Sequence, residues 1–251
     1  MINETQYQLL MNAIKIDQKY IEETIEKQRK EIESIVSYHV RNDKTLRQSD
    51  VESEIAYYAL QEEVETEYDK YHDRPAPIET TKCLEVARVN PNVIGNSGTN
   101  AMQYILQEES KNPTMGNAMI IETLLKYGAD PSQKCRYQGN DIPIIHQFIL
   151  MNNDRSIQAT LELFNTLLDY TSNVNVTDNW GRNIGHLLYD IYNSSKYTTY
   201  ILENVIGTTI INLDHKALID DQDKVTLAKI RGTLPKSYGK SVQELIVENR
   251  V

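Results

Sequence analysis

The stretch Ile120–Pro131 (IIETLLKYGADP) decides the fold of this chain, because a second stretch, Leu163–Asn175 (LFNTLLDYTSNVN), repeats its pattern. Each stretch begins as a short apolar helix, passes through a helix-ending turn and continues as a polar extended segment. Gly128 suits the left-handed residue that ends many helices. Thr171 stands at the equivalent position, where a left-handed backbone is strained for a β-branched side chain. The pair of stretches predicts tandem helical repeats.

A glycine-led segment that enters another helix accompanies these stretches. The glycines are Gly98, Gly139 and Gly181, and the intervals between them are 41 and 42 residues. The clearest segment is 178–188 (DNWGRNIGHLL), and 96–105 and 138–146 are weaker copies. One helix pair cannot bury its apolar face alone, so such repeats are expected to stack into a continuous core with polar ends.

The motifs resemble those of the ankyrin repeat. The resemblance rests on the leucine pair followed by Gly-Ala-Asp-Pro at 124–131 and on the Asp-x-x-Gly-x-x-x-x-His pattern at 178–186, which puts His186 at the family's usual histidine. The repeats are longer than the family's 33 residues, and the family's Thr-Pro-Leu-His core is degenerate. The resemblance is clearest over 95–206 and implies an α-solenoid, with a last turn and helix at 238–246 as a C-terminal cap.

The N-terminal part predicts long helices. Between Glu4 and Val40 there is no Gly or Pro, and apolar residues recur at steps of three and four. Ser49 and Glu52 match a capping box, which predicts a second helix as far as Tyr71. Two long helices with one break predict an antiparallel hairpin. We therefore expect an all-α chain: an acidic helical hairpin at 1–78 and an ankyrin-repeat domain at 79–251.

The formal net charge is −10, and residues 1–79 carry −8 of it. An acidic chain lacks the basic face that nucleic acid or an anionic membrane requires, so we expect neither as a partner. No apolar run approaches the length of a membrane span, and no secretory signal is visible, so we expect no membrane insertion and a cytoplasmic location. Cys83 and Cys135 are expected to be reduced thiols.

Catalytic motifs are missing from the sequence. The five histidines lie far apart, at 39, 72, 146, 186 and 215, and none pairs with a cysteine at metal spacing. We therefore predict no metal, no cofactor and no enzyme activity. The alternative is an enzyme whose small helical N-terminal unit is targeted by the ankyrin repeats. A third possibility is a scaffold that self-associates through residues 4–72, although a monomer is expected.

Partner binding is implied by the resemblance, because ankyrin domains bind other proteins through their turn tips and the concave face of their first helices. The tip residues expected to contact a partner are Tyr137, Gln138, Asn140, Asn179, Trp180 and Arg182. Trp180 is the only tryptophan and stands on a turn that is expected to be exposed, and aromatic and arginine residues often dominate interfaces. The alternative for Trp180 is packing on the neighbouring turn.

The expected function is therefore protein–protein interaction, as an adaptor or an inhibitor of another protein. A composition rich in Ile, Asn and Tyr is typical of an AT-rich genome. Divergent ankyrin proteins of this style resemble effectors of intracellular bacteria and poxvirus proteins, and such an effector would act in the cytoplasm of a host cell.

Overall fold

The computed structural model describes residues 2–42, 75–151, 157–192, 236–237 and 239–248. In this part the chain is mainly helical, and two short strands, β1 (Lys134–Tyr137) and β2 (Asn140–Pro143), pair as an antiparallel hairpin. The mainly helical content agrees with the expected all-α class, and the short hairpin is a local departure that the sequence did not predict. The second N-terminal helix that the sequence predicts, and with it the helical hairpin, lies outside the described residues.

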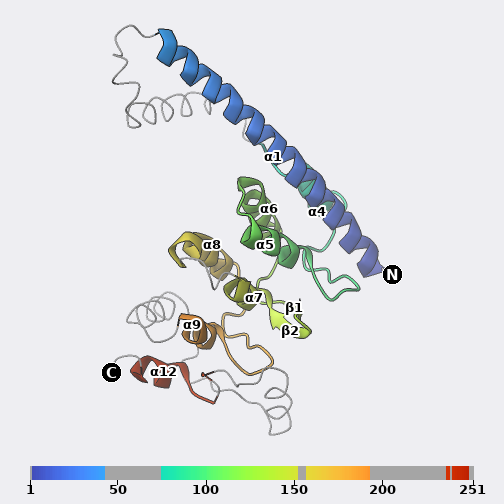
Figure 1. The fold of residues 1–251 in the computed structure, drawn as a ribbon. Helices are drawn as coiled ribbons and strands as arrows, with labels where there is room; N and C mark the ends of the chain where they lie inside the picture. The colour runs from blue at the N-terminus through green and yellow to red at the C-terminus, as the bar shows by residue number, and fades with distance from the viewer. Residues whose placement is uncertain (1, 43–74, 152–156, 193–235, 238, 249–251) are drawn as a thin grey trace.

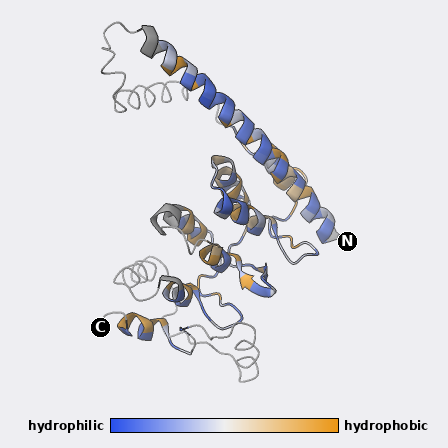
Figure 2. Ribbon diagram, viewed as in Figure 1, coloured by the Kyte–Doolittle hydropathy of each residue, from blue (hydrophilic) through white to orange (hydrophobic). Residues whose placement is uncertain are grey.

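Helix α1 (Ile2–Asn42) is a single uninterrupted helix, as its sequence predicts. Leu10, Ile14 and Ile21 from the apolar stripe are fully buried. The opposite side is charged. Its exposed side chains form ion pairs between residues four positions apart, such as Lys30 with Glu26. Figure 2 accordingly shows α1 as mainly hydrophilic along its length.

The remaining helices follow α1 in sequence order, and Figure 1 shows α1 at one end of the array and α12 at the other. Their bounds are α4 (Ile78–Glu85), α5 (Ala101–Lys111), α6 (Met115–Lys126), α7 (Ile144–Met151), α8 (Ile157–Asp169), α9 (Ile184–Tyr192) and α12 (Val242–Glu248). Helix α5 contacts α7, α7 contacts α9, and α9 contacts α12. One hydrophobic cluster runs through buried residues from α1 to α12. No helix in the described ranges combines the length and the hydrophobicity needed to cross a bilayer.

The three glycines that the sequence singles out, and Gly239 near the C-terminus, each precede a helix of the array. Gly98, Gly139, Gly181 and Gly239 have φ values of 82°, 85°, 71° and 74°, in the left-handed region that favours glycine. They stand before α5, α7, α9 and α12, respectively. A left-handed glycine thus stands in the segment that leads into each of these four helices.

A second local motif recurs after α4, α6 and α8. The side-chain Oδ1 atoms of Asn90, Asp130 and Asn173 each accept a hydrogen bond from the backbone amide two residues later, at 2.9–3.0 Å. The carbonyl of the same residue accepts from the amide three residues later. These Asx turns lead the chain out of each helix in the same way.

Side chains also link one Asx turn to the next. Asn92 donates through Nδ2 to the carbonyl of Gly128 at 2.7 Å and accepts from the Asp130 amide at 2.8 Å. Asp130 in turn accepts hydrogen bonds from the amide and hydroxyl of Ser172. Burial raises the pKa of Asp130, but the hydrogen bonds from Ser172 and Ser132 outweigh it and lower the pKa below its usual value. These hydrogen bonds between consecutive Asx turns fix the register in which α4, α6 and α8 stack.

The helix ends differ where the sequence differs. Gly128 ends α6 with φ +89°, as predicted, and the Ala129 amide donates to the carbonyl of Leu124. Thr171, at the position equivalent to Gly128, does not adopt a left-handed conformation. Its hydroxyl instead donates to the carbonyl of Leu167 at 2.6 Å. The exposed Arg88, which follows α4, does adopt a positive φ of 50°.

Helix α1 packs on α4, α5 and α6 and is fixed to them by polar contacts. Near its start, the Tyr7 hydroxyl lies 3.1 Å from Oγ1 of Thr99, and Glu4 accepts a hydrogen bond from the Asn96 amide at 2.6 Å. About three turns later, Asp17 accepts from the amides of Glu79 and Thr80 at 3.1 and 2.6 Å. The first half of α1 thereby covers the end of the helical array.

Candidate partner-binding face

The tips that the sequence proposes for binding are the turn of the β hairpin and the turn before α9. In the hairpin, Tyr137 pairs with Asn140 across a two-residue turn made by Gln138 and Gly139. Both turn residues have positive φ, 49° and 85°, as a tight hairpin whose twist matches its strands requires. Gln138 is exposed, and Tyr137 and Asn140 are half-buried. These three predicted residues therefore lie together on an accessible tip.

A groove lies beside this tip, between the C-terminal ends of α5 and α7. It has a volume of about 360 Å³. Its walls are Gln107, Ser110, Lys111, Tyr137, Leu150 and Met151. Lys111 Nζ donates a hydrogen bond to the Glu108 carboxylate at 2.7 Å and forms an ion pair with it. This hydrogen bond raises the pKa of Lys111. Burial raises the pKa of Tyr137, so its hydroxyl stays protonated at neutral pH and can both donate and accept.

The turn before α9 is organised differently from the prediction. Oδ1 of Asp178 accepts hydrogen bonds from the amides of Trp180 and Arg182 at 2.8 and 3.0 Å, and Asn179 remains exposed at the turn. Trp180 is 1% exposed and Arg182 is 3% exposed. The expectation that these two side chains stand on an exposed surface is wrong.

Trp180 belongs to a small second core. It packs with Ile142 of β2, and half-buried Tyr137 and Leu150 lie against the pair. The Arg182 guanidinium lies 4.9 Å from the centre of the Trp180 ring, within the range of a cation–π contact. The alternative prediction, that Trp180 packs on the neighbouring turn, describes this arrangement. Trp180 therefore packs against the inner side of the β hairpin and does not lie on the surface.

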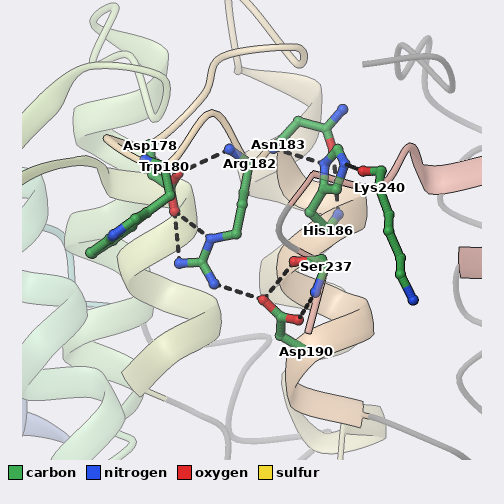
Figure 3. A network of polar contacts seen from close by, with 8 residues as sticks. All are labelled: Asp178, Trp180, Arg182, Asn183, His186, Asp190, Ser237 and Lys240. Carbon is green, nitrogen blue, oxygen red and sulfur yellow. Dashed lines mark hydrogen bonds and ion pairs between the residues drawn. The ribbon is translucent and has the colours of Figure 1, made fainter. Parts of the chain in front are cut away.

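Arg182 is held by two carboxylates, as Figure 3 shows. Its Nε and Nη2 atoms lie 2.8 and 2.7 Å from Oδ2 of Asp178, and its Nη1 lies 2.7 Å from Oδ2 of Asp190. Asp190 also accepts hydrogen bonds from the amide and hydroxyl of Ser237 at 2.9 and 2.8 Å. A single buried guanidinium thus connects the turn before α9 to the segment that leads into α12.

His186 makes a second connection to that segment. Its Nε2 donates to the carbonyl of Lys240 at 2.8 Å, and its Nδ1 accepts from the Asn183 amide at 3.2 Å. This assigns a structural role to His186, the histidine on which the ankyrin resemblance partly rests. Gln103 of α5 makes the corresponding contact to the carbonyl of Arg136 at 2.8 Å.

His146 occupies the same position in α7 but has a different environment. It is fully buried, and neither ring nitrogen has a hydrogen-bond partner within the described residues. Burial, followed by the positive charge of Arg182, lowers the pKa of His146 to about 3. The ring is therefore neutral at physiological pH.

The remaining reactive groups are poorly placed for chemistry. Cys83 and Cys135 are free, buried thiols, and burial raises the pKa of Cys135 to about 12, so its reactive thiolate form is negligible at neutral pH. Where the chain is described, no group of three His, Cys, Asp or Glu side chains is arranged to hold a metal ion.

Most of the groove was missed by sequence reasoning, which identified Tyr137 alone among its lining residues. A partial signal is present, because 107, 110 and 111 share one face of a helix. The burial of Arg182 also had a signal: acidic residues stand four positions before it and eight after it. Neither pattern shows by itself which elements meet.

No family model, curated protein or solved structure matches this chain.

Proposed function

We propose that this chain is a protein-binding module of the ankyrin-repeat type, and that a partner protein docks on the hairpin tip and the groove between α5 and α7. The solenoid assignment is supported by the recurring left-handed glycines, the recurring Asx turns and the consecutive contacts of α5, α7, α9 and α12. In such a stack, tips and first helices form one extended surface.

The observation that carries the proposal is the groove of about 360 Å³ beside the Gln138–Gly139 turn. Tyr137 and Leu150 line it and also rest on the Trp180 core, so the apolar part of the groove is preformed. A preformed surface binds with less ordering cost than a mobile one. Gln107, Ser110 and Lys111 add polar groups that can orient a partner. Trp180 and Arg182 contribute indirectly, because Trp180 packs against the β hairpin and Arg182 packs against Trp180.

The test compares two substitutions with the same change of charge. Lys111→Glu alters the groove, and Lys126→Glu alters an exposed lysine in the last turn of α6. Each variant and the wild-type chain are used for affinity capture from cell lysate, followed by quantitative mass spectrometry. We expect a set of proteins captured by the wild type and by Lys126→Glu to be depleted at least about tenfold with Lys111→Glu.

A second groove variant, Ser110→Arg, adds bulk without reversing an existing charge and is expected to give the same depletion. Circular dichroism checks that the variants keep the helical content of the wild type. Equal capture of all proteins by the wild type and the groove variants would remove this groove as the binding surface.

A further inference from the structure

A contact that recurs along the row of helices is interrupted at His146, the third residue of α7. The third residue of α5, Gln103, donates to the carbonyl of Arg136 in the segment before α7. The third residue of α9, His186, likewise donates to the carbonyl of Lys240 in the segment before α12. Neither ring nitrogen of His146 has a partner among the described residues, so the segment before α9 receives no such hydrogen bond.

The surroundings of His146 oppose a positive charge on its ring. The side chain is fully buried, so protonation would place a cation where water cannot solvate it. Arg182 from the turn before α9, Lys134 of β1 and His186 of α9 add repulsion between like charges. Burial is the larger cause, and together these effects lower the pKa of His146 to about 3.

Within the described residues, no acidic side chain accepts a hydrogen bond from His146. Asp178 and Asp190 direct their carboxylates to the Arg182 guanidinium, at 2.7–2.8 Å. The other charged residues on the strands and helices that pack against α7 are Arg136 on β1, Asp141 on β2, Glu108, Glu109 and Lys111 on α5, and Glu162 and Asp169 on α8. An imidazolium at position 146 would therefore have no acceptor for either of its N–H groups.

Separation of α9 from α7 removes these obstacles. Water then reaches the ring of His146, and Arg182 and His186 move away with α9, so the pKa of His146 returns toward 6.5. The separated form binds a proton that the packed form excludes. A fall in pH below 6.5 therefore shifts the equilibrium toward the separated form.

We propose that His146 makes the junction between α7 and α9 an acid-sensitive switch, at which α9 and α12 separate as one unit while α1, α4, α5 and α6 stay packed. The unit holds together because Asp190 of α9 accepts from Ser237 and His186 donates to Lys240, both in the segment before α12 (Figure 3). The other end is held by α1, which packs on α4, α5 and α6. This switch goes beyond the proposed function and does not depend on it.

Amide hydrogen exchange of the full chain, followed by mass spectrometry at pH 7 and pH 5, measures this separation. The conditions are chosen so that closing is faster than exchange, and the rates are corrected for the intrinsic effect of pH. Protection should fall about 25-fold between pH 7 and pH 5, the factor that follows from pKa values of about 3 and 6.5 in the two forms. We expect this loss in peptides from 184–192 and 242–248, and no comparable loss in peptides from 101–126.

His146→Gln is the matched variant, because glutamine does not titrate and is the residue at the equivalent position of α5. It should reduce the loss of protection in 184–192 to less than about twofold. His186→Gln makes the same substitution at the equivalent position of α9 and serves as the control. Since His146 is intact in this control, peptides from 184–192 should keep the loss of about 25-fold.

The proposal is overturned if protection does not fall between pH 7 and pH 5, or if the loss persists in His146→Gln. An equal loss in 101–126 and 184–192 would show that acid unfolds the whole chain at once and would also overturn it. Circular dichroism establishes that each variant is folded. If His146→Gln does not fold, His146→Leu replaces it, because leucine also lacks a titrating group and leaves no buried polar atom unpaired.

Discussion

Arg88 and Gly128 occupy corresponding helix-ending positions, and only one of them is a glycine. Arg88 has φ +50° and Gly128 has φ +89°. A non-glycine residue pays a steric cost in this region. We predict that Arg88→Gly raises the free energy of unfolding by about 0.5–1 kcal/mol, measured by urea denaturation.

The reciprocal variant is Gly128→Ala. A Cβ at Gly128 would meet no atom within 4 Å, so its cost is conformational. It is expected to lower the free energy of unfolding by about 1 kcal/mol. A destabilised Arg88→Gly variant would show that the arginine side chain makes a compensating contribution.

His146 predicts a pH dependence of stability. Its pKa is about 3 in the folded chain, against 6.5 for the free side chain. Below pH 6.5 the unfolded chain therefore binds a proton that the folded chain does not, so this residue destabilises the fold as the pH falls from 6.5 toward 3. His146→Gln removes the titrating group, and glutamine is the residue at the equivalent position of α5, Gln103.

The measurement is the unfolding free energy of the wild type and His146→Gln between pH 7 and pH 4. We expect the wild type to lose stability faster, with a difference in slope of at most about 1.4 kcal/mol per pH unit. Parallel pH profiles would show that His146 becomes protonated in the folded chain.

At the scale of elements, Asp17 joins α1 to the start of α4. It is 1% exposed and accepts hydrogen bonds from the amides of Glu79 and Thr80. These are amides that a helix cannot satisfy internally. We predict that Asp17→Ala lowers the free energy of unfolding by about 2 kcal/mol, measured by chemical denaturation.

Asp17→Asn is the matched variant, because its side chain retains one oxygen that can accept one of the two amides. It should lose less stability than Asp17→Ala. The exposed pair of Lys30 and Glu26 in the same helix provides a control, since Lys30→Ala should change stability by less than about 0.5 kcal/mol. If Asp17→Ala were as mild as this control, α1 would not be capping α4.

At the scale of the whole molecule, Asp190 links the array to its C-terminal helix. Its carboxylate forms an ion pair with Arg182 from the turn before α9 and accepts hydrogen bonds from Ser237 in the segment before α12. Removing it leaves the Arg182 guanidinium, whose side chain is 4% exposed, with Asp178 as its remaining ion-pair partner among the described residues. We predict that Asp190→Ala weakens the docking of α12 by about 3 kcal/mol, seen as faster amide hydrogen exchange in residues 242–248.

The control for this prediction is Glu248→Ala. It breaks an ion pair with Lys240 in the same region, but both side chains are more than 40% exposed. Exchange in α9 and α12 should change little. Equal effects of the two variants would show that the buried carboxylate does not hold α12 in place.

Much of the described fold could be predicted from sequence because it is local. A helix across 4–40 follows from helix propensity and spacing, and the structure extends it by two residues at each end. Gly128 and the glycines at 98, 139 and 181 adopt positive φ because only glycine does so without cost. Thr171 departs from the repeat pattern for the same reason: its side chain disfavours the left-handed backbone, and its hydroxyl offers another hydrogen bond.

Tertiary structure decided which residues are accessible. The sequence determined that Trp180 and Arg182 stand on a turn, but not that Ile142 from the preceding hairpin covers the tryptophan or that Asp190 reaches the arginine. It likewise gave no sign that Asp17 caps a helix that begins 61 residues later. Backbone conformation depends on neighbouring residues in the chain, whereas burial, capping between helices and the groove depend on segments that meet only when the helices stack.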